Sequence, residues 1–119
     1  MGRPLGRLKR REDFLRVAAA RTKRVAHGFV LQACPSPQSS EETRVGFTAS
    51  RKVGGAVDRN KTKRRLRVAA RHVLSELGKP GMDYVLIGRR GTATMAFETL
   101  EKDLRHAVIK ISEPRRKKK

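Results

Sequence analysis

Arginine and lysine side chains are concentrated between positions 51 and 71, and their spacing is the feature of the sequence that most suggests chemistry. Each residue of an α-helix advances by about 100°, so residues three and four apart share a face. Such a face, roughly opposite an apolar stripe, is formed by Asn60, Arg64, Arg67 and Arg71. Guanidinium groups bind phosphate oxygens through paired hydrogen bonds, so the pattern predicts a phosphate-binding helix.

More basic residues widen this face near the start of the predicted helix, namely Arg59, Lys61, Lys63 and Arg65. Asp58 stands where it would cap the helix, and the helix dipole adds positive potential there. A run of charges is ordinarily a solvated helix face. Here acidic partners are missing and the i,i+4 pairs carry like charges, which disfavours a helix that faces only water. We therefore expect a polyanionic ligand.

Residues suited to catalysis or metal binding are not grouped in the sequence. The histidines are His27, His72 and His106, which are widely separated. The single cysteine, Cys34, leaves no pair of thiolates for a zinc site and is expected to be a small buried strand residue. The segment 55–62 approaches a phosphate-binding loop but lacks the glycine before its lysine. We expect no metal site and no catalytic group in the chain itself.

Charge is the dominant compositional feature of this chain of 119 residues. Its 30 lysine and arginine residues outnumber 11 aspartate and glutamate residues, giving a formal net charge of +19. The length predicts one domain. Nucleic-acid phosphates are the usual partners of such proteins, because each cationic contact releases counterions. Membranes are the rival partner, but the sequence has no lipid-anchoring pattern and no long apolar run, so we expect a cytoplasmic protein that does not bind membranes.

Hydrophobic periodicity predicts alternating helices and strands without an internal repeat. Aromatic residues make up only 4% of the chain, which argues against a protein that stacks RNA bases on several exposed rings. Taken alone, Phe14, Phe29 and Phe47 are interpreted as core residues. The expected elements are a short helix over 11–20, a brief strand over 22–26, antiparallel strands over 29–34 and 44–50 joined by a proline-containing loop, a long helix over 56–77, a strand over 82–88 and a helix over 96–111.

Four segments together resemble one family. The segment Val53–Arg67, VGGAVDRNKTKRRLR, closely resembles the signature of the bacterial ribonuclease P protein subunit. Arg7–Phe14 resembles that family's N-terminal segment, Arg44–Lys52 the strand before the signature, and Asp83–Ile87 its last strand. The resemblance spans nearly the whole domain, which we place at residues 1–111, with a basic extension over 1–10 and a disordered basic tail over 112–119.

The resemblance implies a fold and a function. The fold would be α+β, an α/β sandwich with a central mixed sheet of about four strands, three helices and a rare left-handed βαβ crossover. The protein would bind the catalytic RNA of ribonuclease P, one protein per RNA, together with the 5′ leader of precursor tRNA. The RNA would remove the leader with Mg²⁺ bound mainly by RNA and substrate, and the protein alone would not be catalytic.

The resemblance also implies two groups of site residues. The first would contact the RNA subunit and consists of Arg51, Lys52, Arg59, Asn60, Lys63, Arg64, Arg67 and Arg71. The second would line a cleft for the leader and consists of Phe14, Arg16, Val17, Phe29 and Gln32. The family usually has a second aromatic residue where this chain has Ala18, and often a tyrosine in place of Gln32. Phosphate contacts would then carry more of the leader affinity.

Two alternatives remain open at this stage. A structural RNA- or DNA-binding protein of ribosomal or nucleoid type would explain the charge but not the pattern match along the chain. A nuclease made of protein alone would need clustered metal-binding carboxylates, which the sequence does not show.

Overall fold

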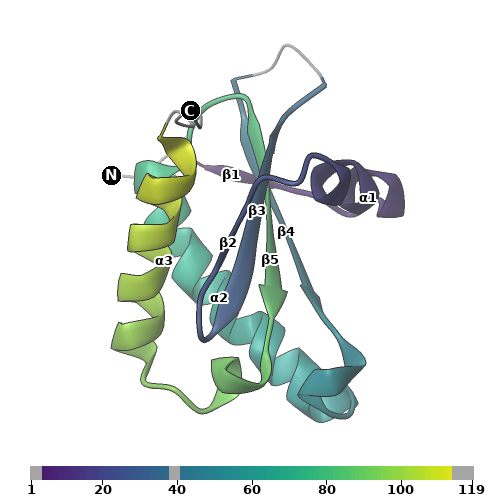
Figure 1. Ribbon diagram of the computed structural model, residues 1–119, viewed down its shortest axis with the longest axis vertical. Coiled ribbons are helices and arrows are strands. Elements are labelled where there is room, and N and C mark those ends of the chain that lie inside the picture. Colours follow the sequence, from purple (N-terminus) through teal and green to yellow (C-terminus); the bar gives the residue numbers. More distant parts are fainter. Residues whose placement is uncertain (1–3, 38–40, 114–119) are drawn as a thin grey trace, which may run out of the picture.

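A five-stranded mixed sheet forms the centre of the molecule, with two helices on one face and one helix on the other (Figure 1). The computed structural model describes residues 4–37 and 41–113. The strands are β1 (Leu5–Arg7), β2 (Lys23–Val25), β3 (Phe29–Pro35), β4 (Thr43–Ala49) and β5 (Met82–Gly88). The helices are α1 (Arg11–Ala19), α2 (Ala56–Leu77) and α3 (Phe97–Ser112), with 3-10 turns η1 (Arg51–Val53) and η2 (Arg90–Ala93).

Strand β5 occupies the middle of the sheet, whose order is β1-β4-β5-β3-β2. It pairs in parallel with β4 and antiparallel with β3. The sequence predicted β3 and β4 to be antiparallel strands joined by a loop. Their directions are indeed opposite, but they are not hydrogen-bonded neighbours, because β5 enters between them from much later in the chain.

The sheet has five strands where about four were expected. The additional strand is β1, which lies within the predicted N-terminal extension and pairs in parallel with β4. Its three residues include Gly6, and so short a segment gives no periodic signal. The brief strand predicted over 22–26 is present as β2, an exposed edge strand antiparallel to β3.

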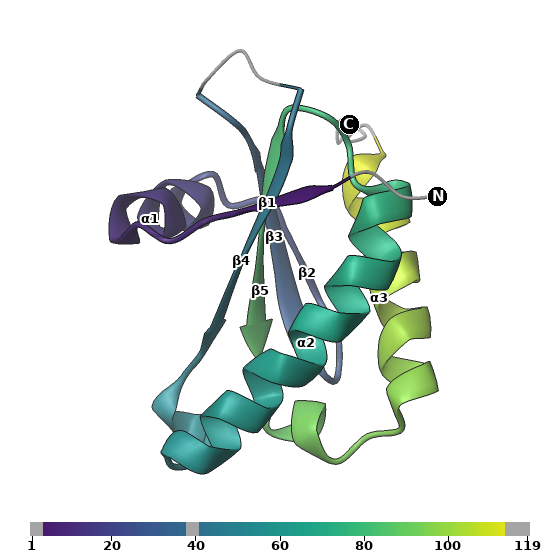
Figure 2. The same cartoon turned by 180° about the vertical axis from the view of Figure 1, so that it is seen from behind.

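Helix α2 joins the parallel strands β4 and β5 by a left-handed crossover. In Figure 1 both strands run downward, β5 lies in front of β4, and α2 lies on the side of the sheet away from α1; Figure 2 shows the same arrangement from behind. Seen from the helix side with the strands turned upward, β5 is therefore to the left of β4. About 98% of such connections are right-handed, so the resemblance, and not general rules, implied this hand.

The larger core lies between the sheet and the pair α2 and α3. Five residues of the predicted apolar stripe of α2 are wholly buried there, namely Leu66, Ala69, Ala70, Val73 and Leu74, and the sixth, Leu77, is partly buried. The two alanines allow the helix backbone to approach the sheet closely. Helix α3 contributes Leu100, Leu104, Ala107 and Val108. Strand β3 contributes Phe29, Leu31 and Ala33.

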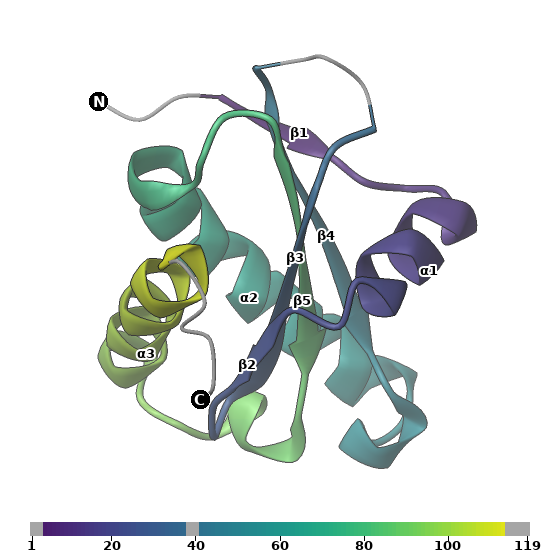
Figure 3. The same ribbon diagram turned by 45° about the horizontal axis from the view of Figure 1, so that its top comes forward.

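The smaller core lies on the opposite face, beneath α1. Its buried residues are Leu8, Val17 and Val85, with Phe14 and Ile87 packed at the edge. Helix α1 has only nine residues and crosses one end of the sheet, so part of this face is not covered by a helix (Figure 3). This uncovered area is the first candidate for a binding surface.

The ends of the helices follow the sequence closely, with two differences. Helix α2 spans 56–77 as predicted, but its N-cap residue is Gly55, and Asp58 lies in the first turn where it faces Gly54. Helix α3 continues to Ser112, the first residue of the segment predicted to be a disordered tail. Residues 114–119 lie outside the described part of the chain, as do residues 38–40 of the predicted loop.

A glycine permits the close approach of α2 to the end of β5. A Cβ atom on Gly88 would overlap Cγ2 of the buried Thr62. We expect Gly88→Ala to lower the free energy of unfolding by about 1–3 kcal/mol, because the packed helix cannot move away freely. Thr62→Ser removes the overlapping methyl group, so the same glycine replacement should cost less in that background. Denaturant unfolding of the four proteins tests this, and an undiminished cost would show that the overlap is not the cause.

Candidate nucleic-acid interface

The polar residues of α2 differ in their exposure to solvent. Asn60, Arg64 and Arg71 are exposed, as the sequence predicted. Arg59 and Lys63 are half-buried near the start of the helix. Arg51 and Lys52 are exposed in η1, immediately before α2. We call the surface formed by Arg51, Arg59, Asn60, Lys63, Arg64, Arg67 and Arg71 the α2 surface.

Arg67 lies closer to the core than a residue opposite the apolar stripe would. Its guanidinium is over the ring of Phe47 at 5.9 Å from the ring centre, and that of Arg7 from β1 is over the same ring at 5.8 Å. The Nε of Arg67 is buried without a hydrogen-bond partner among the described residues. Arg67 therefore adds charge to the α2 surface from a position partly fixed by stacking on Phe47.

Arg65 is bonded within the fold, whereas the sequence predicted that it would be part of the free cationic surface. Its guanidinium donates to the carbonyl oxygens of Ala93 at 2.8 Å and Met95 at 2.7 Å, and it lies over the ring of Phe97. Ala93 is the last residue of η2, and Met95 lies in the connection from η2 to α3. The planar fork of Arg65 therefore fixes that connection to α2.

The face of the sheet beside α1 has a row of residues that the helix leaves half-exposed. Cross-strand partners share a face, and the register aligns Val25, Val30, Ile87 and Thr48 from β2 to β4. The neighbouring row toward α1 contains Gln32, Val85 and Gly46. We call Val25, Val30, Gln32, Thr48 and Ile87 the open sheet face. Val25, on the edge strand β2, is the most exposed member of this face at 61%.

The residues predicted for a leader cleft separate into those that reach this face and those that do not. Gln32 lies on the open sheet face, and Phe14 of α1 packs beside it over Gly46. Phe29 points to the opposite face and is wholly buried in the larger core, so its assignment to the cleft was wrong. Strand alternation separates Phe29 from Gln32, and that signal was available in the sequence.

Two more cleft predictions are corrected by burial and bonding. Val17 is wholly buried between α1 and the sheet and offers no surface to a ligand. Arg16 donates to the buried carboxylate of Asp83 at 2.6 Å and to Asp13 at 3.2 Å. Burial lowers the pKa of Arg16, but the hydrogen bonds to Asp83 and Asp13 and the nearby negative charge together raise it more, so its net pKa lies above the usual range. Arg16 therefore stabilises the fold through these bonds and is not a free cation of the predicted cleft.

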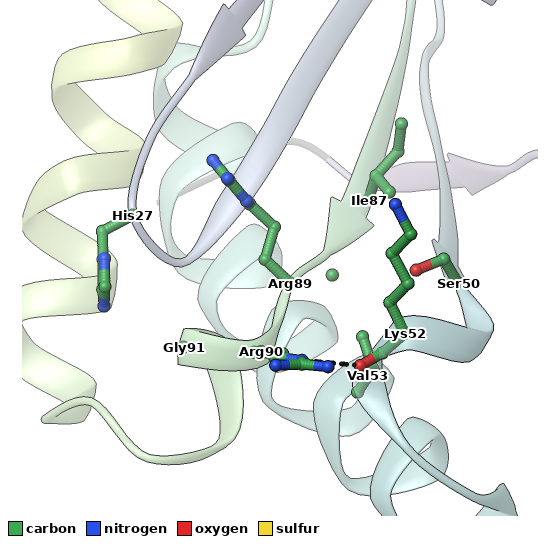
Figure 4. A pocket seen from close by; sticks show the side chains of 9 residues that line it. His27, Ser50, Lys52, Val53, Ile87, Arg89, Arg90 and Gly91 are labelled. Atoms are coloured by element: carbon green, nitrogen blue, oxygen red, sulfur yellow. Dashed lines mark hydrogen bonds between the residues drawn. The ribbon is translucent and has the colours of Figure 1, made fainter.

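A cationic hollow of about 370 Å³ extends the open sheet face at the end of β5 (Figure 4). It is lined by Ile87 together with Lys52, Arg89 and Arg90, and by His27 and Ser50. Arg89 donates to the carbonyl of Ala26 at 2.8 Å and Arg90 to that of Lys52 at 3.0 Å. In Figure 4 the side chain of Lys52 extends alongside Ile87, toward the open sheet face. Lys52 thus lies between the two surfaces.

Sequence reasoning missed Arg89 and Arg90 as site residues. Their signal was a pair of arginines directly after the most apolar strand, where side chains gather at a sheet edge. No ion pair to a carboxylate is formed by Lys52, Arg89 or Arg90 within residues 4–37 and 41–113. The hollow is therefore suited to an anion.

The donor groups for a metal ion are dispersed in the described part of the chain. No group of three histidine, cysteine, aspartate or glutamate residues there is placed to hold one. Cys34 is half-buried in β3 beside Arg16. None of the helices in the described ranges is long and apolar enough to span a membrane.

Comparison with known proteins gives the family of this chain. Residues 4–112 match the family described as Ribonuclease P. The chain belongs to the ribonuclease P protein family. It is 49% identical over 109 residues to the ribonuclease P protein component of Ruegeria pomeroyi, covering 91% of this chain and 87% of that protein. With that of Paramagnetospirillum magneticum it shares 45% over 114 residues, covering 93% and 86%.

Solved structures of ribonuclease P proteins share the fold. The protein from Staphylococcus aureus superposes with a TM-score of 0.72 at 29% identity, covering 90% of this chain and 94% of that chain. The protein from Thermotoga maritima gives 0.69 at 28% identity, covering 82% and 90%. The expected α+β fold with a mixed sheet and three helices is thereby confirmed for this ribonuclease P protein.

The different roles of Arg65 and Arg64 lead to a stability prediction. Arg65→Lys should lower the free energy of unfolding by about 1–3 kcal/mol, because one ammonium group cannot reproduce both carbonyl contacts of the guanidinium fork. Arg64→Lys, on the exposed side of the same helix, should change it by less than about 0.5 kcal/mol. Denaturant unfolding measures both variants. Equal effects of the two would contradict the structural role of Arg65.

Proposed function

We propose that this chain is the protein subunit of ribonuclease P, which binds the catalytic RNA and the 5′ leader of precursor tRNA and assists the RNA in removing that leader. The observation that carries the proposal is the family match over residues 4–112, joined to two separate cationic surfaces on one small domain. Two surfaces fit a protein that contacts an RNA subunit and a substrate together.

The α2 surface is proposed to bind the RNA subunit. Arg64 and Arg71 are exposed one above the other along the helix, seven residues or about two turns apart. Exposed guanidinium groups on one face of a helix suit phosphates of a folded RNA, because each can take two phosphate oxygens. Arg51 in η1 and Arg59 in the first turn of α2 add positive charge near the start of the helix.

The open sheet face is proposed to bind the single-stranded leader. Val30 and Ile87 give it an apolar floor on which unstacked bases can lie, with Phe14 and Gln32 at the α1 end. Lys52 and Arg89 at the other end suit the leader's phosphates. Only one aromatic side chain, Phe14, borders the face in the described ranges, so charge should contribute more to leader affinity than base stacking does.

The chemistry of leader removal is assigned to the RNA. No group of three or more histidine, cysteine, aspartate or glutamate residues in the described part of the chain is placed to hold a metal ion. The contribution of the chain would be affinity and charge neutralisation, with one protein for each RNA. Mg²⁺ would be bound mainly by RNA and substrate, and a protein that neutralises phosphates lowers the concentration of Mg²⁺ that the reaction needs.

Reconstitution tests the proposal directly. Ribonuclease P RNA at a Mg²⁺ concentration too low for activity alone should cleave precursor tRNA at the mature 5′ end when the protein is added, and the protein without RNA should do nothing. The measurement is the rate of leader release. Binding of the protein to RNA without rescue of cleavage would instead favour a structural nucleic-acid-binding protein.

The α2 surface predicts a specific salt dependence. Replacing Arg64 and Arg71 by alanine should weaken binding to the RNA subunit and reduce the slope of log affinity against log salt by about 0.7–0.9 for each phosphate that the variant no longer binds. The matched control is Arg24→Ala with Lys102→Ala, which removes the same charge from exposed positions on β2 and α3. If the slope falls equally in both double variants, the effect is one of net charge and the α2 surface does not bind the RNA subunit.

A further inference from the structure

The carboxylate of Asp83 is completely buried in the central strand of a protein whose formal net charge is +19. It accepts hydrogen bonds from Arg44 of β4 on both oxygens, at 2.9 and 2.8 Å, and from Arg16 of α1 at 2.6 Å. The hydrogen bond to Asp83 raises the pKa of Arg44 above its usual range. A buried ion is retained only where such bonds satisfy it, so all three groups are held in fixed geometry.

The geometry of the pair between Asp83 and Arg44 is set by the sheet itself. The two residues are register partners on neighbouring strands, and Cys34 continues the same row on β3. The fork of Arg44 therefore fixes the carboxylate before α1 is considered. The Oδ2 of Asp83 can still accept one more hydrogen bond, and Arg16 of α1 donates it.

Arg16 is bonded on every side toward the fold. Besides Asp83 and Asp13, it donates to the carbonyl of Pro35 at 3.2 Å and contacts the Sγ of Cys34 at 3.5 Å. The two carboxylates balance the two guanidinium groups of the cluster. The cluster is therefore locally neutral and does not attract an anion, although it lies close to the proposed leader site.

Apolar packing alone fixes α1 only weakly. A helix of nine residues is shorter than the roughly 12–15 residues that an isolated helix needs in water. Val17 is its only wholly buried side chain in the described structure, and Leu15 is 56% exposed. Apolar contact is also non-directional, so it does not fix how far along the sheet the helix lies. The hydrogen bonds of Arg16 are directional, so they fix the position of α1 along the sheet.

We propose that Asp83 is a positioning residue for the leader-binding face, because its buried carboxylate holds α1, through Arg16, where that helix closes one end of the open sheet face. The inference rests on the proposed function of that face. Phe14 is the group that it positions. This ring fills the space above Gly46, where a Cβ would come within 2.6 Å of its Cζ, so the place of Phe14 at the border of the face depends on where α1 lies.

The experiment distinguishes loss of the bond between Arg16 and Asp83, which we call the α1 anchor, from a loss of overall stability and from a change of net charge. Arg16→Met removes the fork, keeps an apolar stem and leaves the pair between Asp83 and Arg44 intact. Arg11→Met is the matched control, since Arg11 is an exposed cation of the same helix whose loss changes the charge equally. The reconstituted holoenzyme is measured with precursor tRNA whose leader crosses the open sheet face and with precursor tRNA whose leader is a single nucleotide. Hydrogen exchange of the free protein reports the α1 amides.

For Arg16→Met we expect faster exchange in α1, unchanged exchange in α2 and α3, and about tenfold weaker binding of the long-leader substrate. Short-leader binding and affinity for the RNA subunit should not change. Arg16→Lys, which keeps a charge in reach of Asp83, should restore part of the affinity, and Asp83→Asn should reproduce the effect of Arg16→Met. Arg11→Met should change long-leader binding by less than about twofold.

Two results would overturn the proposal: equal weakening by Arg16→Met and Arg11→Met, or α1 exchange that Arg16→Met leaves unchanged. If Asp83→Asn fails to fold, the Arg16 variants still decide. If the wild-type holoenzyme does not distinguish the two leaders, the proposed leader site itself is wrong. Hydrogen exchange of the α1 amides then tests by itself whether Arg16 holds α1 in place.

Discussion

The burial of β5 between β3 and β4 is the constraint on which the rest of the structure depends. Its residues alternate between the two cores, so Tyr84 and Leu86 pack beneath α2 and α3 while Asp83 and Val85 face α1. Gly88 at its end allows α2 to approach the sheet. One strand thus positions the helix of the α2 surface and the helix beside the open sheet face. The α2 surface and the open sheet face are fixed relative to each other because α2 and α1 both pack against β5.

The number of cations overstates the number available to a ligand. Arg16 and Arg44 are bonded to Asp83, and Arg65 holds two backbone carbonyls. Arg64 and Arg71, by contrast, are exposed on α2. Composition therefore indicates the class of partner, whereas only the hydrogen bonds show which guanidinium groups remain for it.

Local sequence pattern predicted the elements better than their arrangement. The bounds of α2 and β5 follow from apolar periodicity and from the residues that end each element, because both signals are local. The insertion of β5 between β3 and β4 depends on pairing across distant segments, which no local pattern records. The same limit applies to the site. Exposure of Arg64 and Arg71 followed from helical spacing, whereas the bonding of Arg16 to Asp83, 67 positions away, did not. The misplacement of Phe29 was avoidable, because alternation along β3 already separated it from Gln32.

The sheet order also has a consequence for how the chain acquires its structure during synthesis. The pairs β1–β4 and β2–β3 are joined only through β5, which is made after two thirds of the chain. Until β5 has left the ribosome, the two halves of the sheet have no common strand and neither core is closed. Contacts between segments so distant in sequence slow folding, because the intervening chain must be ordered first. The nascent protein therefore completes its fold late, with its positive charge already exposed among ribosomal and messenger RNA.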